Sequence, residues 1–243
     1  MTSPLVRRPA RTVAALGIGA VGCLATIGLA RSDAVVAGAA VALVFLSCWS
    51  TFDWVYRLPL PEDAAKIVRR VLRSVVYLPA VPFLPLPPLT APWWGWLAGT
   101  ALGAGLVATQ WRETRRWLQP AYLRVFPPLT AVDRARDLIH FSVGGGCQEY
   151  LYRHAVIVGF TPLLGWGVVP LSAALFFVEH RVQGGASWDR KDLTVQTVLG
   201  GSAALLVYAG GGWLPAVLAH TIYNAPSVVF TARRPSAARA VPS

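Results

Sequence analysis

Three stretches in the C-terminal half of the chain carry polar or ionisable side chains inside apolar runs. They read CQEYLYRH at residues 147–154, FFVEH at 176–180 and HTIYN at 220–224. Carboxylate and imidazole groups can exchange protons, and amides donate and accept hydrogen bonds. Such groups are costly inside a membrane helix, so their presence there indicates function. We therefore treat the three stretches as the candidate site.

Spacing places the polar groups of two stretches on shared helix faces. Glu149 and Arg153 are four residues apart, and so are His220 and Asn224. Residues four apart lie on one face of a helix, where an ion pair between Glu149 and Arg153 lowers the cost of burying both. Each pair alone also fits a structural role, as a packing ion pair or as a hydrogen bond between helices. Their joint occurrence favours a site.

The depth of these residues in the membrane independently indicates that they lie close together. At a rise of about 1.5 Å per helical residue, Glu149 and His220 lie at similar distances from the same side of a hydrocarbon core about 30 Å thick. His180 joins them if its helix begins near Pro170, because proline is favoured in the first turn of a helix. We therefore expect Glu149, His180 and His220 to converge.

Composition predicts that the elements carrying these groups lie in a membrane. Of the 243 residues, 55% are hydrophobic and only 14% are charged, and the mean hydropathy is +0.51. A soluble domain needs a more polar surface. The net charge of +11 does not indicate nucleic-acid binding, because the basic residues form short clusters between apolar runs rather than one aromatic-rich face. We expect the lipid bilayer as a partner and no nucleic acid.

The predicted fold class is all-α, a polytopic membrane helix bundle with about eight transmembrane helices. About 20 apolar residues cross a bilayer as a helix. The first run has the flanks of a signal peptide, but its length favours a retained span. The third run carries five prolines, each of which removes a backbone donor. The eight runs are 13–30, 34–52, 74–90, 91–110, 138–159, 163–180, 193–210 and 213–230.

Eight crossings also account for the basic residues. With the N-terminus in the cytoplasm, all 22 Lys and Arg residues except Arg31 and Arg153 fall in cytoplasmic segments or the two ends of the chain, as the positive-inside rule predicts. A re-entrant third run would break this alternation. We therefore expect both termini to be cytoplasmic, in a bacterial plasma membrane. The basic loop 62–73 has the pattern of an interfacial amphipathic helix.

The three stretches resemble the CPBP family, which comprises CAAX proteases and bacteriocin-processing enzymes that cleave peptides within membranes. The family's motifs are Glu-Glu-x-x-x-Arg, Phe-x-x-x-His and His-x-x-x-Asn. The resemblance covers about residues 137–230, and it is specific because the three motifs occur in order at suitable spacing. The corresponding residues here are Gln148, Glu149 and Arg153; Phe176 and His180; and His220 and Asn224.

The resemblance implies a role for each of these polar groups in peptide hydrolysis. Glu149 and His180 would polarise a water molecule, and Arg153 would hold Glu149 in place. His220 and Asn224 would stabilise the tetrahedral oxygen, which needs hydrogen-bond donors. The implied substrate is a peptide or protein in the membrane, such as a peptide precursor.

One position departs from the family pattern. Gln148 stands where the family has its first glutamate, and an amide cannot take up a proton at physiological pH. Glu149 would then be the only base, with Gln148 left to orient water. No cofactor is required in this reading, but zinc is an alternative, because Glu149, His180 and His220 also form the donor set of a catalytic zinc site.

The organisation expected from this resemblance has three parts. Residues 1–136 would form N-terminal transmembrane helices with basic cytoplasmic loops, 137–230 the catalytic core, and 231–243 a basic cytoplasmic tail. The main alternative function is a catalytically inactive pseudoprotease that binds a membrane peptide or acts as an immunity-type protein. A transporter is disfavoured, because the two halves of the chain do not resemble one another.

Overall fold

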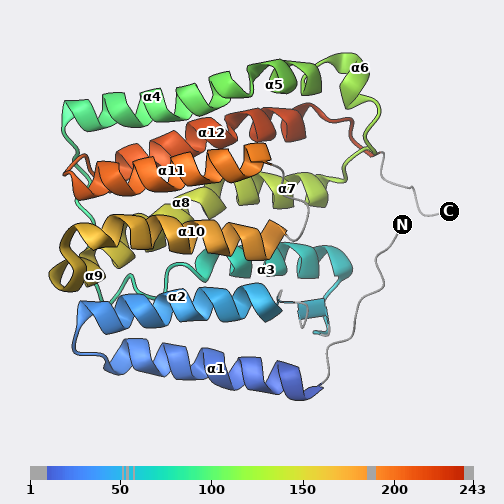
Figure 1. Ribbon diagram of the computed structural model, residues 1–243. Coiled ribbons are helices and arrows are strands. Elements are labelled where there is room, and N and C mark those ends of the chain that lie inside the picture. Colours follow the sequence, from blue (N-terminus) through green and yellow to red (C-terminus); the bar gives the residue numbers. More distant parts are fainter. Residues whose placement is uncertain (1–9, 51, 53–54, 57, 185–189, 238–243) are drawn as a thin grey trace.

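The computed structural model describes residues 10–50, 52, 55–56, 58–184 and 190–237, and this part of the chain contains helices and no strand. The predicted all-α class is thereby confirmed. Arg7, Arg8, Arg57 and Arg239, which entered the topology prediction, lie outside these ranges. The helices pack lengthwise in one bundle (Figure 1). They are α1 (Ala10–Leu29), α2 (Asp33–Ser50), α3 (Glu62–Val75), α4 (Trp93–Thr109), α5 (Trp111–Trp117), α6 (Pro120–Leu123), α7 (Ala131–Ile139), α8 (Gly145–Glu149), α9 (Val156–Leu164), α10 (Val168–Gly184), α11 (Arg190–Tyr208) and α12 (Trp213–Arg233).

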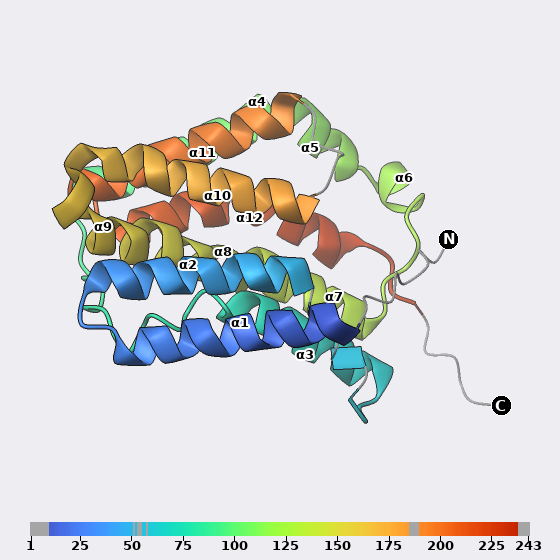
Figure 2. The ribbon, with the colours of Figure 1, turned by 60° about the horizontal axis from the view of Figure 1, so that its bottom comes forward.

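The helical stretch from α7 to α9 carries the first motif and lies in the middle of the bundle. It runs between α1 and α2 on one side and α4, α11 and α12 on the other (Figures 1 and 2). Two π-helical turns, His140–Gly144 and Tyr150–Ala155, flank α8. Such widened turns often occur at functional sites. At Gly165 the backbone adopts φ of +51°, a conformation that favours glycine, and the chain reverses into α10.

The third predicted span, residues 74–90, is not a helix, and that prediction was wrong. α3 ends at Val75 and residues 76–92 form turns and irregular chain. The physical reason is the run of prolines, which cannot donate backbone hydrogen bonds and clash with the preceding helical turn. The helix predicted for the basic loop 62–73 is present as α3.

The irregular segment 76–92 is anchored to the protein by a few buried residues, while Leu86 and Leu89 are exposed. Tyr77, Ala80 and Leu84 are buried, and His154 Nε2 lies 2.6 Å from the carbonyl oxygen of Pro85. Irregular backbone is tolerated at membrane depth where protein covers it and supplies its hydrogen bonds. The segment can therefore cross the bundle without being a helix.

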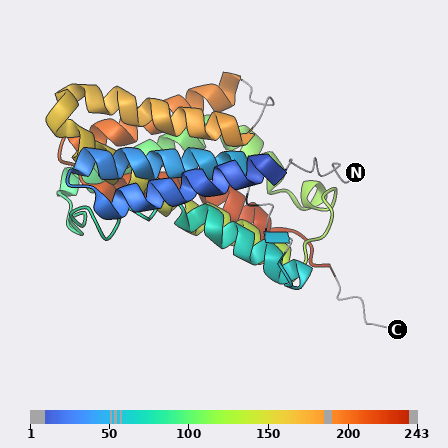
Figure 3. The same ribbon diagram turned by 90° about the horizontal axis from the view of Figure 1, so that it is seen from below.

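The basic elements gather at one end of the bundle. α1 begins and α12 ends at that end, where α3, α5 and α6 also lie (Figures 1 and 3). The turn between α1 and α2, which contains Arg31, lies at the opposite end (Figure 1). Residues 58–92 still lead the chain from the basic end to the opposite end. The irregular third run therefore leaves the alternation of basic and non-basic turns intact.

One helical stretch of the described residues is long and apolar enough to cross a membrane by length and composition. It is Ala131–Val182, with 52 residues and a hydropathy of 1.7. Ala14–Leu29 and Asp33–Cys48 are shorter apolar helices. Because the long stretch reverses at Gly165, it contains two of the predicted runs. The number of eight transmembrane helices stays a prediction.

α4 and α12 run side by side in unusually close contact. Three glycines of α4, spaced four residues apart, face the backbone of α12 and the turn before it. A Cβ atom added to these glycines would lie 2.2, 2.3 and 2.6 Å from carbonyl oxygens, so only glycine permits this approach. This glycine motif lies outside the three polar stretches of the candidate site. The contacts pair Gly95 with Gly211, Gly99 with Pro215, and Gly103 with Ala219.

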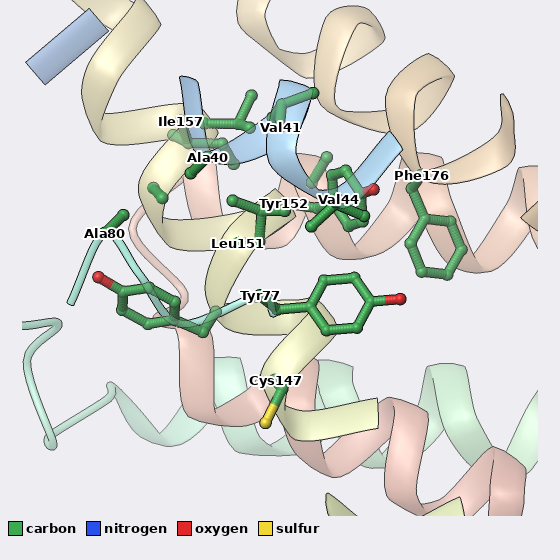
Figure 4. Packing of buried hydrophobic residues seen from close by; sticks show 14 of the residues in the cluster. Ala40, Val41, Val44, Tyr77, Ala80, Cys147, Leu151, Tyr152, Ile157 and Phe176 are labelled. Atoms are coloured by element: carbon green, nitrogen blue, oxygen red, sulfur yellow. The ribbon is translucent and has the colours of Figure 1, made fainter. Parts of the chain in front are cut away.

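An aromatic cluster joins the irregular segment to the motif helices. The ring of Tyr152 packs edge to face against Tyr77 at 6.5 Å and against Phe176 at 5.8 Å between centroids. Figure 4 shows these side chains beside apolar residues of α2 and of the stretch from α8 to α9. The cluster fixes Phe176, which belongs to the second motif, and Tyr77, which lies outside every motif.

Candidate active site

A cavity of about 580 Å³ lies among α3, α5, α8, α10, α11 and α12. Two of the predicted site residues, Glu149 and Arg153, are fully buried and are not among the residues that line it. The other four line its wall together, which agrees with the predicted convergence of the three stretches. These four are Gln148, His180, His220 and Asn224.

Glu149 connects the first motif to the third. Its Oε1 accepts a hydrogen bond from His220 Nδ1 at 2.8 Å, and its Oε2 lies 3.2 Å from Arg153 Nε. The predicted ion pair is thus confirmed. Because the carboxylate accepts from Nδ1, that nitrogen carries the proton, and the Nε2 of neutral His220 is left as a proton acceptor. Glu149 is therefore placed to orient and charge-stabilise His220.

Arg153 ties the first motif to α10. Its Nη1 donates to Ser172 Oγ at 2.9 Å, and Ser172 in turn donates to the carbonyl oxygen of Tyr152 at 2.6 Å. The guanidinium carbon lies 4.6 Å from the centroid of the Phe176 ring, a cation–π distance. A cation held on three sides in this way neutralises Glu149 without reaching the cavity.

His180 is fixed by its own helix. Its Nδ1 lies 2.9 Å from the carbonyl oxygen of Phe176, which can only accept, so Nδ1 carries the proton and Nε2 is the acceptor. The Phe176 ring lies 4.2 Å from the His180 ring and 6.1 Å from the His220 ring, measured between centroids. The phenylalanine of the second motif thus packs near the rings of both histidines.

Asn224 is oriented toward the first motif. Its Nδ2 donates to the carbonyl oxygen of Phe141 at 3.1 Å, within the first π-helical turn. A Cβ atom at Gly145 would lie 3.3 Å from both Asn224 Nδ2 and His220 Nε2. The missing side chain at Gly145 therefore lets the third motif approach the first at the cavity wall.

Gln148 is held by groups that the sequence analysis did not use. Its Nε2 donates to Glu179 Oε2 at 3.2 Å and to the Tyr77 hydroxyl at 3.2 Å. Tyr77 itself donates to Glu179 Oε1 at 2.6 Å. Glu179 is fully buried. An acidic residue directly before the histidine of FFVEH was a visible signal for it, but the motif pattern drew attention only to Phe176 and His180.

Two arginines of α3 line the cavity wall toward the basic end. They are Arg70 and Arg73, and Asp192 of α11 also contributes to the lining. Burial lowers the pKa of Arg70 to about 10, and the like charges of Arg73 and Arg136 act in the same direction. Since this pKa lies well above 7, Arg70 is still a cation at neutral pH. The wall therefore carries positive charge.

The predicted zinc alternative requires three free donor groups. Among the residues that the structure describes, no group of three His, Cys, Asp or Glu side chains is arranged to hold a metal ion. Both oxygens of Glu149 are engaged, one by His220 and the other by Arg153. The donor set as arranged does not fit a tetrahedral zinc site.

Comparison with known proteins relates part of the chain to a protein family. Residues 136–226 match the family model described as Type II CAAX prenyl endopeptidase Rce1-like. The match spans less than half of the chain and contains all three motifs, so the resemblance inferred from the motifs is confirmed. At this coarse level it supports a membrane-embedded protease acting on a membrane-associated peptide or protein. No curated protein and no solved structure matched the chain.

Proposed function

We propose that the chain, whose residues 136–226 match the Rce1-like CAAX endopeptidase family model, is an intramembrane endopeptidase that cleaves a peptide bond with water. The observation that carries the proposal is the contact between Glu149 and His220 at 2.8 Å, beside a cavity lined by His180 and Asn224. A carboxylate behind the Nδ1 of a histidine makes its Nε2 an effective general base.

In this mechanism His220 moves the proton. A water molecule in the cavity gives a proton to His220 Nε2 as its oxygen attacks the scissile carbonyl carbon. Glu149 stabilises the resulting imidazolium. When the C–N bond breaks, His220 returns the proton to the leaving amine, so the products are one carboxylic acid and one amine. Motif resemblance alone had assigned this activation to Glu149 with His180; the burial of Glu149 favours an action through His220.

The other polar groups of the wall position the reactants. The attacking water has two O–H groups, of which one donates to His220 Nε2 and the other donates to the oxygen of Gln148 or to His180 Nε2. Asn224 has a second N–H on Nδ2 besides the one given to Phe141, and this N–H can stabilise the tetrahedral oxygen. The neutral Gln148 is thereby compatible with hydrolysis, because the base in this scheme is a histidine.

Two arginines of the cavity wall favour a substrate of negative charge. Arg70 and Arg73 line the cavity, and a low-dielectric cleft strengthens their attraction for an anion. We propose that the preferred peptides carry negative charge near the scissile bond. This charge lies on the end of the substrate that faces the basic end of the bundle.

The proposed topology is multi-pass with both termini in the cytoplasm. Cysteines introduced near Trp93 or Gly211 should react with an impermeant label added from outside, and cysteines near Arg115 or Arg190 should not. The reason is the gathering of basic elements at one end of the bundle (Figure 1), which the positive-inside rule assigns to the cytoplasm. Labelling near Arg115 from outside would refute this orientation.

The decisive experiment compares cleavage and fold in the same preparations. Protein reconstituted in vesicles is incubated with membrane peptides, and new termini are identified by mass spectrometry. We expect His220→Ala and Glu149→Gln to reduce kcat by about 10²–10⁴-fold, with thermal unfolding still cooperative. Full activity of His220→Ala would refute the mechanism. Peptide binding without cleavage by the wild type would instead establish the pseudoprotease.

A further inference from the structure

We propose that Glu179 is a positioning carboxylate that replaces, from α10, the carboxylate missing at Gln148 of the first motif. The proposal rests on the protease function stated above and deepens it. In the family pattern two adjacent carboxylates stand on one helix. Here one of them stands on α8 and the other on α10, and both are buried behind the same cavity wall, whose lining includes Gln148, His180 and His220.

The contacts of Glu179 are those of a group built into the site. Its Oε1 accepts from the Tyr77 hydroxyl at 2.6 Å and lies 4.0 Å from Cys48 Sγ. Its Oε2 accepts from Gln148 Nε2 at 3.2 Å. These donors come from α2, from the irregular segment and from α8, so three separate parts of the chain converge on one buried carboxylate. Packing alone does not require an ionisable side chain at such a position.

Glu179 determines which way the amide of Gln148 points. The Nε2 of Gln148 faces two oxygens, those of Glu179 and Tyr77. In the reverse orientation the amide oxygen would face the carboxylate of Glu179. Both groups are hydrogen-bond acceptors, so they would repel each other. The oxygen of Gln148 is therefore directed away from Glu179, and the side chain lines the cavity. Glu179 in this way converts an amide into a fixed acceptor for the attacking water.

Glu179 also lies behind the second histidine. Its Oε2 is 3.7 Å from His180 Nδ1, on the nitrogen that bonds to the carbonyl of Phe176. Glu149 lies closer behind His220, since it accepts a hydrogen bond from His220 Nδ1 at 2.8 Å, whereas the contact between Glu179 and His180 is electrostatic. The cavity wall thus presents two histidines with a carboxylate behind each. In this arrangement Glu149 orients the general base, His220, and Glu179 orients the groups that hold the attacking water.

The arrangement explains why position 148 is an amide. A glutamate there would place a second carboxylate about 3 Å from Glu179, and two like charges at that distance cannot both be ionised at low cost. Glutamate is therefore expected to be tolerated at position 148 only when position 179 is neutral. Exchange of the two side chains tests this reciprocity directly.

The experiment uses the single variants Glu179→Gln and Gln148→Glu and their combination in the full-length protein in vesicles. We expect each single change to lower kcat about tenfold or more with little change in KM, since water positioning acts in the transition state. The double variant should recover kcat to within about threefold of wild type, since coupled neighbours are non-additive. Its pH profile should also shift, because an ionisable group then faces the cavity.

The outcomes separate this inference from the proposed function. Glu113→Gln, an exposed carboxylate on α5, is the matched control and should leave cleavage unchanged. If Glu179→Gln cleaves like wild type, or if the double variant merely adds the two losses, the inference is overturned while the protease stands. Failure of the double variant to fold also overturns it. If wild type and all variants cleave nothing, the proposed function itself fails.

Discussion

The segment 136–226 and the described residues before it contribute to the cavity in different ways. The first segment matches a protease family and supplies the histidines, Glu149 and Asn224. The earlier residues lie outside that match, yet they supply Tyr77 behind Gln148, the two arginines of the wall and the glycine face of α4. The difference teaches that reacting groups can be recognised by local spacing, whereas the groups that orient them need not lie in any motif.

Breaking the ion pair inside the matched segment should have the largest effect. Arg153→Ala leaves Glu149 as a buried charge without its cation, and such a loss costs about 3–5 kcal/mol. We expect reduced yield and a large drop in the free energy of unfolding, measured by denaturant titration in detergent. Replacing both partners, as Arg153→Met with Glu149→Leu, should recover much of the stability and none of the cleavage. Equal stability of both variants would contradict the buried-pair account.

The second effect arises in the unmatched part. A Cβ at Gly99 would lie 2.3 Å from the carbonyl oxygen of Pro215, so Gly99→Ala must push α12 away. Overpacking of this kind costs about 1–3 kcal/mol, and kcat should fall because α12 carries His220. Gly105→Ala on the same helix is the matched control, since no atom lies within 4 Å of its added Cβ. Similar stability and kcat in the two variants would show that the contact between α4 and α12 does not position the site.

The arginines of the wall test the proposed substrate charge. Arg70→Gln and Arg73→Gln should each raise KM for acidic peptides by about three- to tenfold, equal to about 0.7–1.4 kcal/mol, with kcat nearly unchanged. The effect should shrink at high salt, because screening weakens exposed charges. Arg69→Gln is the control, since that guanidinium lies over the Tyr56 ring and not on the cavity wall. Equal effects on neutral peptides would count against charge recognition.

The smallest effect is expected where the first and third motifs meet. In Gly145→Ala the new Cβ lies 3.3 Å from Asn224 Nδ2 and His220 Nε2, so both must shift by a few tenths of an ångström. We expect a loss of kcat of about two- to tenfold, since small misplacements weaken catalysis. Gly146→Ala is the neighbouring control, because its added Cβ meets only Val217 at 3.9 Å. A larger loss of kcat in Gly146→Ala would show that the contact at Gly145 is not the one on which catalysis depends.

The sequence alone determined the helical class, the pairing of Glu149 with Arg153 and the convergence of the three motifs. The first two follow from composition and from a spacing of four residues on one helix, which is local geometry, and the third was expected from membrane depth and from the motif resemblance. Only the tertiary structure decided that residues 76–92 cross the bundle without a helix, that Gly95, Gly99 and Gly103 contact α12, and that Glu179 faces Gln148. These contacts join residues far apart in the chain, and their distances depend on how helices pack, which local spacing does not encode.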